Sequence, residues 1–388
     1  MEKKLTKIIG LKKEEFDKFV SSGEVHLREA RLIPFFKPGD EMALTSVILS
    51  SIRLIKEFRK MILSEAKMIS GGQIYVYTEV SFSQFKESRV DGMLIIVKGG
   101  TIKDAAIFEM KNGKDILDEK QIERYQEIAK TFSIPRLITV SNQFVSEPTQ
   151  CPVHVKAIKS VDLFHFSWSY LLTIAYVLLF KNDTNIEDED QAEIMREVVN
   201  YLEYDKSGVC GLNQMKPGWT EVVTKINSGA ILKNSDPCIL DAVTSWQQEE
   251  KDMALILSRH LGVLVSSGEK RHKGNLQARL ADDEKSLINN KHLTSTLSVR
   301  DAISDITIIG LLEKRTVEMS VSLKAPHDKT YKGQLGWIKR QLVNCKKKNE
   351  AVPINSEVVH AEILPNRIQI ETAKAKQTTN ISVITATI

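Results

Sequence analysis

A hairpin pattern restricts the fold of this chain more than any other feature of its sequence. Two apolar strands are predicted over 88–98 and 103–111, joined by a Gly-Gly turn. Asp91 stands near the start of the first strand, and Glu109 and Lys111 stand at the end of the second. Because the strands of a hairpin run antiparallel, the start of one meets the end of the other, and the two acids should converge. Side chains alternate along a strand, so Lys111 should lie on the same side as Glu109.

Two carboxylates and one ammonium at a single point suit metal-assisted attack on a phosphodiester bond. Carboxylate oxygens are preferred ligands of hard cations, so we expect Asp91 and Glu109 to bind Mg²⁺, or Mn²⁺ in its place. The competing interpretation is that these residues are charged strand ends that face water. Against it, Glu109 follows the apolar run Ala-Ala-Ile-Phe, where charges without partners would be costly to bury.

A helix predicted over 116–132 follows the hairpin and brings Gln121, Arg124 and Tyr125 toward one side. Gln121 is expected to position water or a phosphate near the acids, and its alternative role is that of a surface amide. Arg124 is a candidate phosphate contact, although pairing with neighbouring helix residues would explain it equally well. Tyr125 is more typical of a core residue than of a catalytic one.

The acid, the Glu-x-Lys and the Gln-x-x-Arg-Tyr helix together resemble the PD-(D/E)xK, or restriction-endonuclease-like, nuclease superfamily over roughly residues 30–145. The proline that usually precedes the aspartate in that family is Val90 here. The resemblance implies an αβββαβ core in which Asp91 and Glu109 bind magnesium. It also implies that Lys111 positions or activates the attacking water.

An upstream helix offers a further acid. Asp40 follows Pro-Gly and is predicted to cap this helix, and Glu41 comes directly after it. Members of the family often carry a metal-binding glutamate on this helix, so Glu41 is one candidate for a further ligand. Its alternative role is stabilisation of the helix dipole. Glu79, on the predicted strand that follows, is the other candidate, with an outward-facing strand residue as its alternative.

We predict an α/β protein of more than one domain, since 388 residues exceed a typical single domain. The predicted parts are a helical segment over 1–30, a nuclease-like domain with appended helices over 31–210, and a β-rich α+β domain over 215–388. Strand-like alternation in His-Leu-Thr-Ser-Thr-Leu-Ser-Val and in two later segments supports the last assignment. We expect this domain to serve recognition or assembly, including a homodimer or a larger complex.

Two short basic runs fall in the C-terminal half. Lys270, Arg271 and Lys273 stand in a polar loop, and Lys346–Lys348 end a predicted helix. Either run is a candidate contact with a phosphate backbone, but most short basic runs are solvated loops.

Composition narrows the class of protein further. There are 54 basic and 50 acidic residues, a net charge of +4 that fits a nucleic-acid partner without requiring one. The four cysteines are far apart, with no zinc-binding spacing, and no nucleotide-binding loop or Ser-His-Asp pattern is evident. The N-terminus lacks the apolar core of a signal peptide, and the most apolar run, 170–180, is too short for a bilayer. A cytoplasmic protein with no membrane partner is expected.

These features together predict a magnesium-dependent nuclease, most simply a DNA endonuclease, with RNA as the alternative substrate. Related activities serve restriction or antiviral defence, which is an association at the level of the family. The rival hypothesis is a catalytically inactive nuclease fold that binds nucleic acid or acts as a scaffold in a multiprotein complex.

Overall fold

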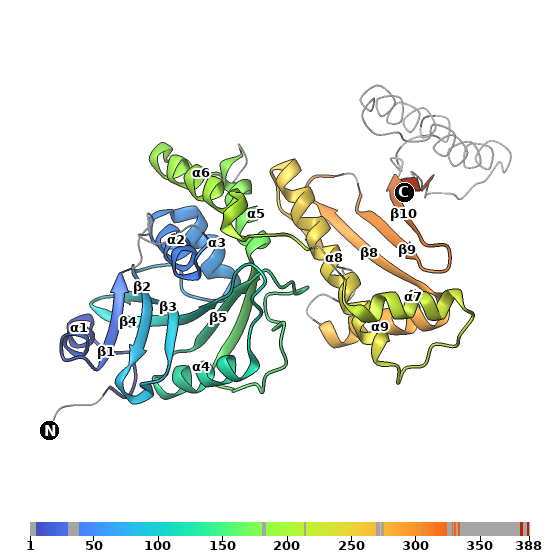
Figure 1. Ribbon diagram of the computed structural model, residues 1–388. Coiled ribbons are helices and arrows are strands. Elements are labelled where there is room, and N and C mark those ends of the chain that lie inside the picture. The colour runs from blue at the N-terminus through green and yellow to red at the C-terminus, as the bar shows by residue number, and fades with distance from the viewer. Residues whose placement is uncertain are drawn as a thin grey trace. The chain divides into compact units, whose positions relative to one another are not determined.

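The computed structural model describes most of the chain and divides it into two units (Figure 1). The described residues are 5–29, 39–180, 184–212, 215–268, 272, 275–302, 304–323, 328, 330, 333, 381–382 and 386–387. One unit comprises Met1–Asn213 with Lys251–Leu264, and the other comprises Gln214–Glu250 with Val265–Ile388. Each unit is described by itself below.

The first unit is built on a mixed sheet whose spatial order follows the chain from β1 to β6. Its strands are β1 (Val25–Glu29), β2 (Gln73–Phe82), β3 (Arg89–Lys98), β4 (Thr101–Met110), β5 (Arg136–Ser141) and β6 (Asp162–Ser167). The strands β1 to β4 pair antiparallel with one another, whereas β5 runs parallel to β4 and β6 runs parallel to β5. The parallel pairing requires a crossover, which α4 provides between β4 and β5.

Helices cover both faces of this sheet. They are α1 (Lys13–Ser21), α2 (Glu41–Leu54), α3 (Lys56–Glu65), α4 (Glu119–Thr131), α5 (Trp168–Leu179) and α6 (Glu189–Glu203). Figure 1 shows α4 on one face, with α2 and α3 on the other. Alternate residues of the strands therefore enter two different cores: Leu94 and Ile96 pack with α2 and α3, and Met93 and Ile95 pack with α4.

The helix starts follow the capping residues in the sequence. The Asp40 carboxylate accepts a hydrogen bond from the Met42 amide at 2.9 Å, which confirms the predicted start of α2. In the same way Asp118 accepts from the Gln121 amide at 2.8 Å and begins α4. The predicted order of one helical region, three strands, a helix and a strand is found as α2–α3, β2, β3, β4, α4 and β5.

The second unit packs helices on an antiparallel sheet. Its helices and strands are α7 (Pro217–Asn227), α8 (Pro237–Leu261), α9 (Leu276–Asn290), β7 (Val265–Ser267), β8 (His292–Val299), β9 (Ile306–Leu311) and β10 (Thr316–Leu323). The strands β7 to β10 pair in chain order, and the two-residue strands β11 (Ile381–Ser382) and β12 (Ala386–Thr387) also pair with β10. The last part of α8, from Lys251, belongs to the first unit.

The α/β class is confirmed, with a six-stranded mixed sheet and a second antiparallel sheet. Within residues 1–30, for which a helical segment is predicted, α1 is helical but Val25–Glu29 is a strand, because its backbone pairs with β2. The helices α7 and α9 have no counterpart among the predictions. The apolar run at 170–180 falls in α5, a buried helix as predicted. No helix in the described part of the chain is both long enough and apolar enough to cross a bilayer.

Candidate active site

The register of the hairpin places the two acids side by side. Gly92 pairs with Phe108 across β3 and β4, so the next position along brings Asp91 opposite Glu109. Residues directly opposite in an antiparallel pair point to the same face of the sheet. The Met110 amide donates to Asp91 Oδ2 at 2.7 Å and thereby fixes this carboxylate at the end of β4.

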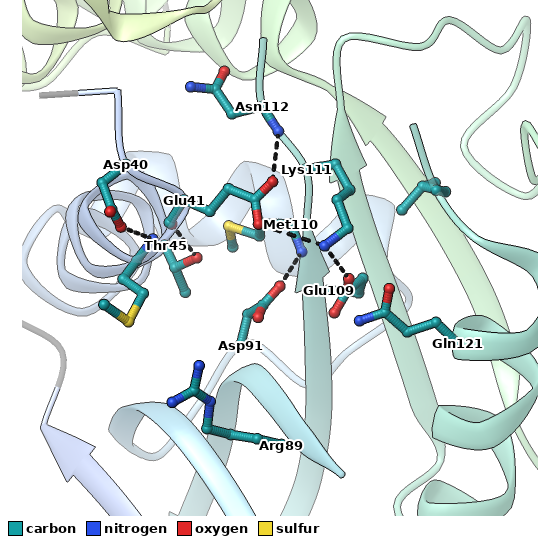
Figure 2. A network of polar contacts seen from close by, with 12 residues as sticks. Asp40, Glu41, Thr45, Arg89, Asp91, Glu109, Met110, Lys111, Asn112 and Gln121 are labelled. Atoms are coloured by element: carbon teal, nitrogen blue, oxygen red, sulfur yellow. Dashed lines mark hydrogen bonds and ion pairs between the residues drawn. The ribbon is translucent and has the colours of Figure 1, made fainter. Parts of the chain in front are cut away.

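Lys111 lies between Glu109 and a third acid, Glu41 (Figure 2). Its ammonium nitrogen lies 2.9 Å from Glu109 Oε1 and 3.4 Å from Glu41 Oε2. The backbone of Lys111 is held on both sides: its amide donates to Val140 O at 2.8 Å, and the Trp168 indole donates to its carbonyl oxygen at 2.8 Å. The position of the ammonium group is therefore set by β5 and α5 as well as by β4.

A glycine allows the helix that carries Glu41 to approach the sheet. A Cβ atom on Gly92 would lie 2.6 Å from Leu49 Cδ1 and 3.3 Å from Thr45 Cγ2, both on α2. A side chain at this position would have to displace the Leu49 side chain, which packs against β3 here. The glycine next to Asp91 thus allows α2, which begins at Glu41, to pack closely on β3.

Burial and mutual repulsion raise the pKa values of the acids. The Glu109 side chain is fully buried, and this burial, followed by the charge of Asp91, raises the pKa of Glu109 to about 9. Burial likewise raises the pKa of Asp91 and that of Glu41. Burial alone would lower the pKa of Lys111, but the carboxylates of Glu109, Glu41 and Asp91 outweigh it and raise that pKa. Without a metal ion, the Asp91 and Glu109 carboxyl groups therefore share a proton.

The acid pair fits a hard cation. Both carboxylate oxygens of Glu109 are buried, and Oε1 lies 2.9 Å from the Lys111 ammonium nitrogen. Among the described residues no group of three or more His, Cys, Asp or Glu side chains is arranged to hold a metal ion, and here the Lys111 ammonium occupies the space between Glu41 and Glu109. Mg²⁺ is commonly held by only one or two carboxylates, with water and substrate oxygens completing its shell. Asp91 and Glu109 are the residues that would hold it.

The helix α4 brings the predicted Gln-Arg-Tyr residues to the same place. The Gln121 amide points toward Glu109 and donates to the Tyr125 hydroxyl at 3.0 Å (Figure 2). Tyr125 is buried and donates in turn to Arg89 O at 2.6 Å, which ties α4 to β3. These contacts give Tyr125 a structural role and leave Gln121 beside the acids.

An open cleft of about 610 Å³ gives access to the site. Its walls include Glu41, Asp91, Lys111, Gln121, Arg124 and Tyr125. The predicted residues Asp91, Glu109, Lys111, Gln121 and Glu41 are thus gathered at one place, and Arg124 lies on the cleft wall.

Glu79 lies apart from this group of residues. It has a left-handed backbone with a φ of 52°, and its carboxylate forms ion pairs of 2.7 Å with both Arg28 and Arg89. Of the two upstream candidates, only Glu41 contacts Lys111. The predicted phosphate contacts Lys270, Arg271 and Lys273, and Lys346–Lys348, lie outside the described residues.

Sequence reasoning missed one residue that supports the site. The Asn112 amide nitrogen donates to Glu41 Oε1 at 3.3 Å, and its side chain donates to Gly39 O at 2.8 Å and to Ser207 O. Asn112 therefore connects the end of β4 to the start of α2. Nothing in the local sequence marks it, because its partners are distant along the chain.

Comparisons with known proteins identify no relative: no protein-family model, no curated protein and no solved structure matches this chain.

Proposed function

We propose that this protein is a magnesium-dependent nuclease of the restriction-endonuclease-like class that cleaves DNA. The observation that carries the proposal is the buried Glu109 carboxylate, which lies beside Asp91 and 2.9 Å from the Lys111 ammonium. The order of α2, β2, β3, β4, α4 and β5 supports the class, because it corresponds to the αβββαβ core that the sequence resemblance implies.

Each residue has a distinct role in this proposal. Asp91 and Glu109 hold the cation once their shared proton has left. A bound Mg²⁺ would polarise a phosphoryl oxygen and lower the pKa of a water molecule. Lys111 stabilises the negative charge that develops on the phosphate, and its position between the acids keeps it protonated. Gln121 is placed to donate a hydrogen bond to the attacking water or to a phosphate oxygen.

The test is cleavage of plasmid, linear duplex and single-stranded DNA, and of RNA, by the purified protein with Mg²⁺, Mn²⁺ or EDTA. We expect DNA cleavage that requires the metal and is lost in Asp91→Asn. This variant keeps the size of the side chain, so we expect it to fold as the unaltered protein does. Circular dichroism checks that it is folded. Cleavage of RNA alone would make the protein a ribonuclease. DNA binding without any cleavage would favour the inactive, nucleic-acid-binding alternative.

A further inference from the structure

A second charged cluster lies on the first unit, outside the acid site. The Glu79 carboxylate, on β2, bridges two arginines from the neighbouring strands: Oε2 contacts Arg28 Nη1 of β1, and Oε1 contacts Arg89 Nη1 of β3, both at 2.7 Å. We call these residues the arginine pair and its bridging glutamate. One acid between two bases leaves the cluster with a net positive charge.

The three side chains of the cluster differ in burial: the glutamate is buried and the two arginines are exposed. The Glu79 side chain is only 8% exposed, whereas the side chains of Arg28 and Arg89 are 66% and 61% exposed. Glu79 also keeps a positive φ, a conformation that persists in non-glycine residues where the surroundings enforce it and that often marks functional sites. The bulge that it forms opposite β1, between the pairs of His26 and Arg28, directs its carboxylate to both arginines.

The arginine pair is continuous with the cleft of the acid site. Arg89 lines that cleft together with Asp91, two residues further along β3. Its backbone is fixed by the Tyr125 hydroxyl, which donates to Arg89 O at 2.6 Å. Two further cations, Lys120 and Arg124, lie on the cleft wall formed by α4. Because Glu87 and Asp118 also line the cleft, it is the arginine pair, and not the lining as a whole, that supplies an excess of positive charge beside it.

Guanidinium groups are well suited to bind a phosphodiester backbone. Each arginine has five N–H donors in a planar fork, and the contact with Glu79 uses one nitrogen of each. The remaining donors can bind phosphate oxygens in pairs, which a phosphodiester backbone presents at regular spacing. Because Glu79 orients both forks in advance, binding would require little further ordering of the arginine side chains.

We propose that Arg28 and Arg89, oriented by Glu79, bind the phosphate backbone of duplex DNA beside the bond that is cleaved. This assignment rests on the proposed nuclease function and deepens it, since it states where the substrate strand runs from the acid site. The strand passes from the cleft over β3 and β2 to the edge strand β1.

The test measures binding of a fluorescent duplex of mixed sequence in EDTA, by anisotropy, at several salt concentrations. Arg28→Ala and Arg89→Ala should each weaken binding and reduce the slope of log affinity against log salt by roughly 0.9. The matched control is Arg196→Ala on α6, which also removes an exposed arginine paired with a glutamate, Glu193. Its slope should equal that of the unaltered protein.

Arg28→Ala is the decisive variant, because Arg89 also lies close to Asp91 whereas Arg28 is two strands away. Thermal melting of each variant establishes that it is folded, and the exposure of both side chains makes a large loss of stability unexpected. An Arg28→Ala slope equal to that of Arg196→Ala would overturn the inference. The binding assay in EDTA does not depend on catalysis. If binding depends on Arg28 but the protein does not cleave DNA with Mg²⁺, the nuclease proposal fails while the phosphate-binding role of the arginine pair holds.

Discussion

Two glutamates, one in each unit, are completely buried beside a cation, and their surroundings differ. In the second unit, Glu250 of α8 contacts the Arg279 guanidinium of α9 through Oε2 and accepts a hydrogen bond from the Ser295 hydroxyl of β8 at 2.8 Å. In the first unit, Glu109 lies beside a second acid, Asp91, and shares its one cation, the Lys111 ammonium at 2.9 Å, with Glu41.

The difference shows which buried charge is structural. Arg279 and Ser295 bind the same oxygen of Glu250, so this ion pair joins two helices and a strand. At Glu109, by contrast, a single ammonium group serves three carboxylates, and negative charge remains in excess. Burial that leaves charge unbalanced is costly in a folded protein unless a further cation is bound there. We therefore expect a structural role for Glu250 and propose that the site at Glu109 holds a metal ion.

The largest expected effect is on cleavage. Glu109→Gln removes a charge that would hold the cation, so metal-dependent DNA cleavage should fall by about 100-fold or more. Glu250→Gln makes the same chemical change in the second unit and should leave the rate per folded molecule unchanged. The measurement is the initial rate of DNA cleavage with Mg²⁺ in each variant, corrected for the fraction of folded protein. Equal rates in Glu109→Gln and in the unaltered protein would remove Glu109 from the mechanism.

Substitutions at the two buried glutamate sites should change the free energy of unfolding in opposite directions: Glu109→Gln should raise it, and Arg279→Ala should lower it. In EDTA, the raised pKa of Glu109 means that its contribution to stability is full below about pH 4.5 and is lost as the pH rises toward 9. Glu109→Gln avoids this loss, so it should be more stable than the unaltered protein at pH 8 by roughly 1–3 kcal/mol and equally stable near pH 4. Arg279→Ala leaves Glu250 buried without its cation and should cost about 3–5 kcal/mol.

Urea unfolding at pH 4 and pH 8 measures both effects. The control is addition of Mn²⁺, which should reverse the advantage of Glu109→Gln at pH 8, because only the unaltered protein keeps both acids of the metal site. A Glu109→Gln protein that is less stable than the unaltered one at pH 8 in EDTA would show that Lys111 already balances the charge of Glu109.

Much of the acid site was predictable because it depends on short-range rules. Strand alternation and hairpin pairing suffice to bring Asp91, Glu109 and Lys111 together, and a capping aspartate locates the start of α2 beside Glu41. Strand alternation could also have predicted that Arg89 lies on the same face as Asp91, because it precedes Asp91 by two residues on one strand.

The remaining contacts depend on which strands become neighbours, and that is decided by tertiary packing. Arg28 contacts Glu79 only because β1 pairs with β2 at the edge of the sheet. The sequence analysis predicted a helical segment around Arg28 instead. Glu79 adopts a left-handed backbone that no residue preference predicts for a glutamate. The ion pair of Glu250 with Arg279 likewise requires α9, a helix that the sequence patterns did not reveal.

The smallest expected effect tests how the site is held in place. The side chains of Asn112 and Asn142 each donate two hydrogen bonds to backbone carbonyls, and each reaches the segment around Gly208: Asn112 binds Gly39 O and Ser207 O, and Asn142 binds Gly113 O and Gly208 O. Of the two side chains, only that of Asn112 reaches the segment that precedes α2, through Gly39 O; the contact with Glu41 is made by the backbone N–H of Asn112.

Asn112→Ala and Asn142→Ala should therefore lose similar stability, about 1–2 kcal/mol, because each removes buried or half-buried hydrogen bonds. Their effects on metal binding should differ. Loss of a residue that orients groups around a metal site typically weakens metal affinity 10-fold or more, so Asn112→Ala should bind Mn²⁺ roughly 10-fold more weakly, with Asn142→Ala unchanged. Titration of Mn²⁺ followed by electron paramagnetic resonance measures affinity without relying on cleavage. Equal affinities in the two variants would mean that the anchoring of Gly39 by the Asn112 side chain does not affect the metal site.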